Sequence, residues 1–301
     1  MDGMPVINFA NYLTGVTYSQ AKRKSAHQPD MYQAIPNPAV EDIFANSLAV
    51  CDPNLVGGLE AQAWASFSKL ITDHILHVQS FQGYGSSFIK KSGFPPDAFA
   101  QTAMQLATYR LFGEQVGTYE ATQVRTFLHG RTEVTRSVST QSEAFVKRMG
   151  LRPLNDETDP SVCSEKIGLL RKATTAHAKY TGLAAKAQGV DRHLMGLSMM
   201  VKGNETTPDL FSDALYARSK KWRSSTSNLS HPRFNLWGYG EVVPDGVGLA
   251  YAVLPNSCVF NITALRETGY ADKLAELLEE AFLEMRTLIE SQESSGVKSR
   301  L

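Results

Sequence analysis

The chain has 301 residues, of which 43% are hydrophobic and 9% aromatic, so it can build a sizeable core and is not expected to be disordered. Thirty basic residues balance thirty acidic ones, which argues against nucleic acid as the main partner. The apolar stretch at residues 248–265 is interrupted by Pro255, Asn256 and Ser257, and it therefore predicts two strands around a turn rather than a transmembrane segment.

Hydrophobic periodicity predicts a mixed α/β fold in which helices outnumber strands. In chain order, helices are predicted over residues 5–18, 61–77, 98–113, 139–149, 160–201 with a break near Gly189, and 274–290. Strands are predicted over residues 118–128, 213–226, 249–254 and 258–265, and residues 79–85 form a short strand or turn. The expected fold class is a mixed sheet flanked by helices.

The cysteines and the chain ends give weak signals. Cys51, Cys163 and Cys258 are far apart, so neither a disulfide framework nor a metal site is expected, and a reducing compartment is favoured. Residues 291–301 are expected to form an exposed tail. It ends in Ser299-Arg300-Leu301, a variant of the Ser-Lys-Leu address that a peroxisomal import receptor reads, although three residues can also match by chance.

Two histidine patterns are candidates for catalytic or metal-binding groups. His74 and His77 lie three residues apart on the predicted helix 61–77, but no third ligand has a convincing spacing, so a helix-surface position is favoured. His129 and Glu133 have the His-x-x-x-acid spacing of a base with its orienting carboxylate. The hydroxyl- and guanidinium-rich segment 131–137 is better suited to ligand binding.

Three polar segments are candidates for ligand contacts. Arg192 in the Asp191-Arg192 pair can hold a carboxylate through two hydrogen bonds, and the alternative is an ion-paired surface turn. The hydroxyl-rich segment 224–227 follows a predicted strand and can donate hydrogen bonds to a developing oxyanion. Lys90 and Lys91 precede a helix start at residues 95–97, a combination that suits a phosphate group.

Taken in order, these segments resemble the choline/carnitine acyltransferase family, most closely the C-terminal half of its fungal-type carnitine acetyltransferases. The resemblance covers nearly the whole chain, and both order and spacing agree. The matching segments are 96–99 (PDAF), 105–110 (QLATYR), 118–120 (TYE), 130–137 (GRTEVTRS), 169–173 (LLRKA), 191–197 (DRHLMGL), 225–227 (STS) and 240–248 (GEVVPDGVG).

The resemblance implies a lobe of the CoA-dependent acyltransferase fold, in which two lobes like those of chloramphenicol acetyltransferase enclose the substrates. Residues 1–37 would be a remnant of the first lobe, 38–290 the second lobe and 291–301 the tail. The implied reaction is reversible transfer of a short acyl group between CoA and the hydroxyl of carnitine. Coenzyme A would be a co-substrate, with no bound cofactor. The tail suggests the peroxisome, with the mitochondrion as a second destination.

The family pattern assigns the carnitine-binding residues by position. Tyr119, Thr132 and Arg192 would hold the carnitine carboxylate, which choline lacks, so the match favours carnitine. Tyr239 would provide the aromatic wall for the quaternary ammonium group. Because Tyr119 and Thr132 are thirteen residues apart, neighbouring strands or a strand and its turn can bring them together.

The same resemblance assigns the acyl and CoA contacts. Ser227 would donate to the thioester oxyanion, Ser225 would order the substrate, and the bulky Trp237 would close the acyl tunnel to long chains unless it packs in the core instead. The CoA-binding residues would be Lys90, Lys91, Asp97 and Asn228. The chain departs from the family pattern at Ser86 (usually lysine), Ala178 (usually arginine) and Asn228 (usually glutamine).

The family's general base is a histidine followed four positions later by an acidic residue. Asp2 aligns with that acidic residue, so the base would precede Met1, and none of the seven histidines occupies its position. We therefore expect a chain truncated just after the base and inactive by itself. The alternatives are a half-length protein that binds CoA or carnitine without turnover, and an interaction protein whose pocket has decayed.

Overall fold

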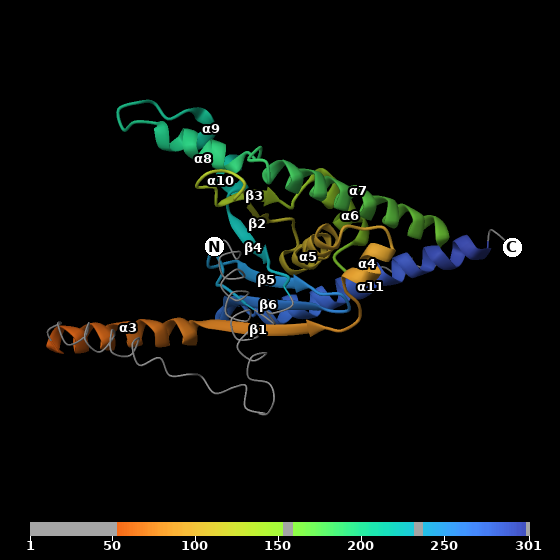
Figure 1. Ribbon diagram of the computed structural model, residues 1–301, viewed down its shortest axis with the longest axis horizontal. Coiled ribbons are helices and arrows are strands. Elements are labelled where there is room, and N and C mark those ends of the chain that lie inside the picture. The colour runs from red at the N-terminus through yellow and green to blue at the C-terminus, as the bar shows by residue number, and fades with distance from the viewer. Residues whose placement is uncertain (1–52, 153–158, 232–236, 299–301) are drawn as a thin grey trace, which may run out of the picture. The chain divides into compact units, whose positions relative to one another are not determined.

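The computed structural model describes residues 53–152, 159–231 and 237–298 (Figure 1). Two compact units are distinguished, one spanning Met4–His74 and the other beginning at Ile75. The described part of the first unit is helix α3 (Pro53–Asp73), which ends before the predicted boundary at His77. Asp2, Cys51, the helix predicted over 5–18, the remnant lobe 1–37 and the tripeptide 299–301 all lie outside the described residues.

The second unit is built on a six-stranded mixed sheet with the strand order β1-β6-β5-β4-β2-β3. The central strands β2, β4 and β5 are parallel to one another, whereas β3 and β6 run antiparallel to their partners β2 and β5. The fold class predicted from the sequence is confirmed. The strands are β1 (His74–Phe81), β2 (Gly117–Gln123), β3 (Thr132–Arg136), β4 (Trp222–Asn228), β5 (Val247–Val253) and β6 (Cys258–Leu265).

The hairpin of β5 and β6 forms where the sequence predicted two strands around a turn. The Leu254 N–H donates to the Ser257 carbonyl at 2.9 Å and closes the turn, and Val253 pairs with Cys258. Every residue of β5 is buried, as expected for an inner strand covered on both faces.

Helices pack against one face of the sheet and form the core with it (Figure 1). Helix α5 lies innermost, and its residues from Ala98 to Thr108 are all buried. Pro96 starts this helix without losing a hydrogen bond, and Gly113 ends it in the left-handed conformation (φ 72°). The helices of this unit are α4 (Ser86–Lys91), α5 (Pro96–Phe112), α6 (Thr140–Met149), α7 (Pro160–Ala184), α8 (Asp191–Met200), α9 (Asp209–Ser212), α10 (Ala214–Ser219), the 3-10 turn η1 (Arg266–Thr268) and α11 (Tyr270–Lys298).

Three sequence predictions were wrong in their secondary structure. His74 and His77 lie on strand β1 and not on a helix, because alternation of exposed and less exposed side chains begins at this point. The strand predicted from Asp213 starts only at Trp222. Asp213 instead caps helix α10 by accepting hydrogen bonds from two backbone N–H groups. The final helix continues beyond Glu290 to Lys298, where an exposed linker was expected.

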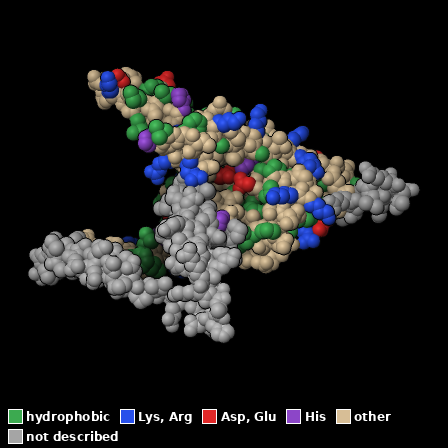
Figure 2. Space-filling view, in the orientation of Figure 1, with side chains coloured by type: hydrophobic (Ala, Val, Ile, Leu, Met, Phe, Trp, Pro, Cys, Tyr) green, Lys and Arg blue, Asp and Glu red, His purple; other side chains and the backbone are tan. Residues whose placement is uncertain are grey.

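The surface agrees with the balanced charge of the sequence. On the face in Figure 2, lysine and arginine side chains are spread out between apolar and uncharged ones. In the described part of the chain, no helix has the length and apolar character that a membrane crossing requires.

Candidate functional site

The register of the sheet sorts the candidate residues onto two faces. Side chains of Thr118 and Glu120 on β2 point toward the helices, since they contact Gln105 of α5 and His177 of α7. Tyr119 therefore points to the opposite face. Its cross-strand neighbours there are Ser225 on β4 and Arg136 on β3.

Tyr119, Thr132 and Arg192 meet on the face away from the helices. Arg192 Nη2 donates to the Tyr119 hydroxyl at 3.3 Å and to Thr132 Oγ1 at 3.4 Å, and Nε donates to the Thr132 carbonyl at 3.1 Å. Thr132 occupies this face because it pairs with Gln123, which is four residues along β2 from Tyr119 and therefore points to the same side. We call these three residues the cradle. Two hydroxyls and an exposed guanidinium in one place suit a carboxylate ligand.

Aromatic side chains lie on the same face, next to Ser225. The Tyr239 hydroxyl is 2.8 Å from the Ser225 carbonyl and 3.1 Å from the Leu249 carbonyl, so the ring is fixed over β4 and β5. Burial raises the pKa of Tyr239, which keeps it a neutral donor. The Trp237 ring lies 5.4 Å from the Tyr239 ring. Gly248 allows this approach, because a Cβ there would come within 2.6 Å of the Tyr239 carbonyl.

Strand β4 carries candidate residues on both faces. Ser225 and Ser227 alternate with Thr226, whose side chain contacts Gln101 of α5, so the two serines share the cradle face. Asn228 follows on the helix side, where its Nδ2 donates to Asp97 Oδ1 at 2.7 Å.

Three of the four residues assigned to CoA lie at α4 and the start of α5. Lys90 and Lys91 are exposed in the last turn of α4. Asp97 is in the first turn of α5, and the same Oδ1 atom that binds Asn228 also accepts a hydrogen bond from the Tyr251 hydroxyl at 2.7 Å. This carboxylate therefore links α5 to β4 and β5.

A buried acid–base pair, which the sequence analysis missed, lies beneath the sheet. His177 Nε2 and Glu120 Oε2 are 2.6 Å apart, and both side chains are 5% exposed. With Asp97 they form a group whose ligand atoms lie within 4.8 Å of one another. Such residues can hold a metal ion, but here Glu120 is bonded to His177, and Asp97 to Asn228 and Tyr251. The group is thus a hydrogen-bonded network.

The environment shifts both pKa values upward. Burial and the nearby Asp97 raise the pKa of Glu120 to about 7, although His177 opposes the shift. Burial lowers the pKa of His177, but the contact with Glu120 outweighs it and leaves the pKa above its ordinary value. The folded chain therefore holds protons at pH values where the unfolded chain has released them.

We expect stability to fall as the pH rises through this range. Both groups have raised pKa values in the folded state, so their contribution is full below about pH 4.5, the ordinary value for Glu120, and is lost as the pH rises from there through 7. Relative to Glu120→Gln, the wild-type chain should lose on the order of 1–3 kcal/mol of unfolding free energy between about pH 5 and pH 8. Urea unfolding at a series of pH values measures this difference.

The matched control for this measurement is Glu143→Gln. Glu143 pairs with Lys147 at the surface, where both side chains are about half exposed, so this variant should follow the wild-type profile. Parallel profiles for wild type and Glu120→Gln would show that the buried pair does not hold the extra proton.

The remaining candidate histidines do not join the cradle. His77 Nδ1 lies 2.7 Å from an Asp272 carboxylate oxygen. His129 is exposed in the turn between β2 and β3 with a positive φ of 59°. Glu133, its proposed orienting acid, is buried and accepts hydrogen bonds from the backbone N–H groups of Val134 and Arg192. This carboxylate supports the start of α8.

The known sequences that this chain resembles are choline and carnitine acyltransferases. Residues 1–280 match the family described as Choline/Carnitine o-acyltransferase. Carnitine O-acetyltransferase of Mus musculus is 37% identical over 243 residues, covering 79% of this chain and 37% of the relative. The mitochondrial carnitine O-acetyltransferase of Saccharomyces cerevisiae is 38% identical over 203 residues, covering 67% of this chain and 29% of the relative. Choline O-acetyltransferase of Sus scrofa is 34% identical over 248 residues, covering 81% and 38%.

Similarity to solved structures is low by comparison. A wax ester synthase/diacylglycerol acyltransferase from Marinobacter aquaeolei matches with a TM-score of 0.35 and 13% identity, over 70% of this chain and 49% of that one. A chloramphenicol acetyltransferase matches with a TM-score of 0.31 and 8% identity, over 69% and 88%. Although the chain spans well under half the length of the sequence relatives above, the family match extends over nearly all of its own residues. The chain therefore belongs to the choline/carnitine O-acyltransferase family.

Proposed function

We propose that the cradle binds the carboxylate of carnitine and that the chain serves the transfer of a short acyl group between CoA and the carnitine hydroxyl. The observation that carries this proposal is the hydrogen-bonded meeting of Tyr119, Thr132 and Arg192 on one face of the sheet. Choline has no carboxylate, so such a cradle has no use in a choline enzyme.

The other end of carnitine is a quaternary ammonium group that forms no hydrogen bonds. Aromatic faces attract such a cation through the negative charge of their π-systems. Tyr239 and Trp237 supply two neighbouring rings, and the Tyr239 hydroxyl donates to the Ser225 carbonyl. Ser227, farther along β4, is the proposed donor to the thioester oxyanion. Ser227 thus lies on β4, and the two aromatic residues lie in the segment that precedes β5.

Coenzyme A would approach from the helix side of β4. The ammonium groups of Lys90 and Lys91 suit a phosphate, and Asn228 is held at the end of β4 by Asp97. The end of this strand is therefore the place where a thioester from one side and a hydroxyl from the other can meet.

A second candidate is binding of both substrates without turnover. A hydroxyl is a poor nucleophile until a base removes its proton. The buried histidine, His177, is bonded to Glu120 on the face opposite Tyr119, so it is not placed to act on a ligand in the cradle. This observation favours the alternative for the chain by itself.

Calorimetry tests the proposal. Carnitine should bind to the chain, choline should bind much more weakly, and acetyl-CoA should bind in the absence of either. A thiol-release assay with acetyl-CoA and carnitine then separates turnover from binding alone. Equal affinity for carnitine and choline would overturn the proposed role of the cradle.

The proposed preference for short acyl groups depends on Trp237. Its indole N–H is buried without a hydrogen-bond partner among the described residues, so the ring is held by packing. Trp237→Ala should improve binding of octanoyl-CoA by about tenfold and leave acetyl-CoA binding unchanged, because the removed ring frees room for methylenes. Competition against a fluorescent CoA analogue measures both affinities.

The control is Trp64→Ala, which removes a tryptophan that is 69% exposed on α3. It should change neither affinity. An unaltered ratio of octanoyl-CoA to acetyl-CoA affinity in Trp237→Ala would mean that this side chain does not line the acyl path.

A further inference from the structure

Arg136, the last residue of β3, contacts residues of three other elements. Its Nε and Nη2 atoms donate to the two carboxylate oxygens of Asp191 at 2.9 and 2.7 Å. Its Nη1 donates to the Ser219 carbonyl at the end of α10, at 3.0 Å. The guanidinium also lies over the Trp222 ring, 5.0 Å from its centroid. One side chain thereby joins β3, α8, α10 and β4.

The contact with Asp191 fixes the start of α8, and Arg192 is the next residue. Within this helix Asp191 alone is buried, and the residue before it provides no side-chain cap. The guanidinium of Arg192 is exposed and makes hydrogen bonds of 3.1 to 3.4 Å, so these bonds alone hold it weakly. Its position depends on where the helix begins.

The contact with Trp222 connects Arg136 to Tyr119, a second residue of the cradle. The Trp222 and Tyr119 rings meet edge to face with centroids 5.7 Å apart. Arg136 stacks on Trp222 and pairs with Tyr119 across the strands. The same guanidinium thus supports the cradle arginine through Asp191 and the cradle tyrosine through Trp222.

We propose that Arg136 is a positioning residue: through its ion pair with Asp191 and its stacking on Trp222, it holds Arg192 and Tyr119 in the arrangement that binds a carboxylate. The inference rests on the proposed function, since the ligand is the carboxylate of carnitine. Lysine cannot replace it, because an ammonium group can neither bind both carboxylate oxygens in one plane nor stack flat on a ring.

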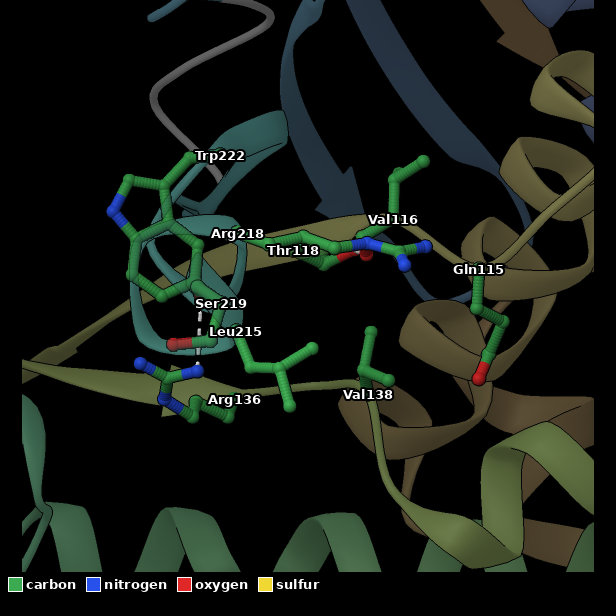
Figure 3. Close-up of a pocket in the computed structure, with 10 residues that line it drawn as sticks. Gln115, Val116, Thr118, Arg136, Val138, Leu215, Arg218, Ser219 and Trp222 are labelled. Carbon is green, nitrogen blue, oxygen red and sulfur yellow. Dashed lines mark hydrogen bonds between the residues drawn. The ribbon is translucent and has the colours of Figure 1, made fainter. Parts of the chain in front are cut away.

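A cavity beside Arg136 makes the inference testable by chemical rescue. Arg136, Trp222, Ser219 and Leu215 line part of a cavity of about 360 Å³, and Figure 3 shows the guanidinium at its edge, bonded to Ser219. Guanidinium ion added to an Arg136→Ala variant can enter through this open space and occupy the vacated position.

The experiment measures carnitine and CoA affinities by calorimetry for Arg136→Lys, Arg136→Ala, Arg192→Ala and the double alanine variant. Arg136→Lys should lose about tenfold in carnitine affinity and keep its CoA affinity. Millimolar guanidinium should restore part of the loss in Arg136→Ala, whereas sodium chloride at the same ionic strength should not. In the Arg192→Ala background, the second substitution should cost less, because the part of its effect that acts through Arg192 is already lost.

Amide hydrogen exchange over residues 190–194, without ligand, gives a second measurement. Faster exchange in Arg136→Lys than in wild type, with the rest of the sheet unchanged, supports the positioning role even if carnitine does not bind. Equal exchange, additive losses in the double variant, or a parallel loss of CoA affinity would overturn it. If Arg192→Ala keeps full carnitine affinity, the proposed function fails, and the exchange measurement still decides the role of Arg136.

Discussion

Replacing Arg192 with alanine is expected to weaken carnitine binding by about 100-fold, which corresponds to loss of a charge-assisted contact worth on the order of 2–3 kcal/mol. The substitution removes the only charged member of the cradle and leaves the hydroxyls of Tyr119 and Thr132 in place. Tyr119 and Thr132 are half-buried, so the removal of Arg192 leaves no fully buried side chain unsatisfied. Calorimetric titration with carnitine measures the loss.

Two comparisons give this prediction its specificity. Arg192→Lys keeps the charge but not the planar pair of donors, so it should recover only part of the affinity. Acetyl-CoA affinity should be unchanged in both variants, because Asp97 and Asn228 lie on the other side of β4. If alanine at this position lowers carnitine and acetyl-CoA affinity alike, the cradle is not a separate carboxylate site.

Replacing Glu284 with alanine is expected to lower the free energy of unfolding by about 3–5 kcal/mol, because it leaves a buried arginine without its partner. Arg110 of α5 donates through Nη1 and Nη2 to both carboxylate oxygens of Glu284 on α11, at 2.7 and 2.8 Å. The Arg110 side chain is 1% exposed. A drop in melting temperature of about 10 °C is expected for a chain of this size and can be followed by circular dichroism.

The control is Glu276→Ala on the same helix. Glu276 pairs with Lys273 at the surface, and both side chains are more than half exposed, so its loss should change stability by less than about 1 kcal/mol. A double replacement, Arg110→Met with Glu284→Leu, should be more stable than Glu284→Ala, since no charge is left buried. Equal stability of Glu284→Ala and Glu276→Ala would refute the structural role of the buried pair.

The sequence was most informative where one face of an element is buried against the core. Strand β6 has the predicted bounds, and the helix predicted over 160–201 exists as α7 and α8 with a break on either side of Gly189. Predictions failed where local capping or a change of period decides the outcome. The sequence of β3 favours a ligand-binding segment over a strand, because its many hydroxyls and charges hide the alternation of apolar and polar side chains that predicts a strand.

The candidate site was predictable only through resemblance. Nothing in the local pattern brings Arg192 to Tyr119, which precedes it by 73 residues. The pairs Glu120–His177 and Arg136–Asp191 were missed for the same reason, since their members are 57 and 55 residues apart and meet only after the sheet and helices have packed. The sequence alone leaves an ion-paired surface turn open for Asp191 and Arg192. The structure gives Asp191 an ion pair with Arg136, in which Asp191 is buried and Arg136 is half-buried.

Strand β4 presents Ser227 to the cradle side and Asn228 to the helix side, so under the proposed function two adjacent residues would serve two different ligands. A strand that slips or bends must move both contacts together. Occupation of one side therefore restricts the motion available to the other, and the two ligands should bind with mutual dependence even though they need not touch the same side chain. Inserting a single residue ahead of Ser225 would turn every following side chain of β4 to the opposite face of the sheet. Ser227 would then leave the cradle face and Asn228 the helix side, so both proposed contacts would be lost together.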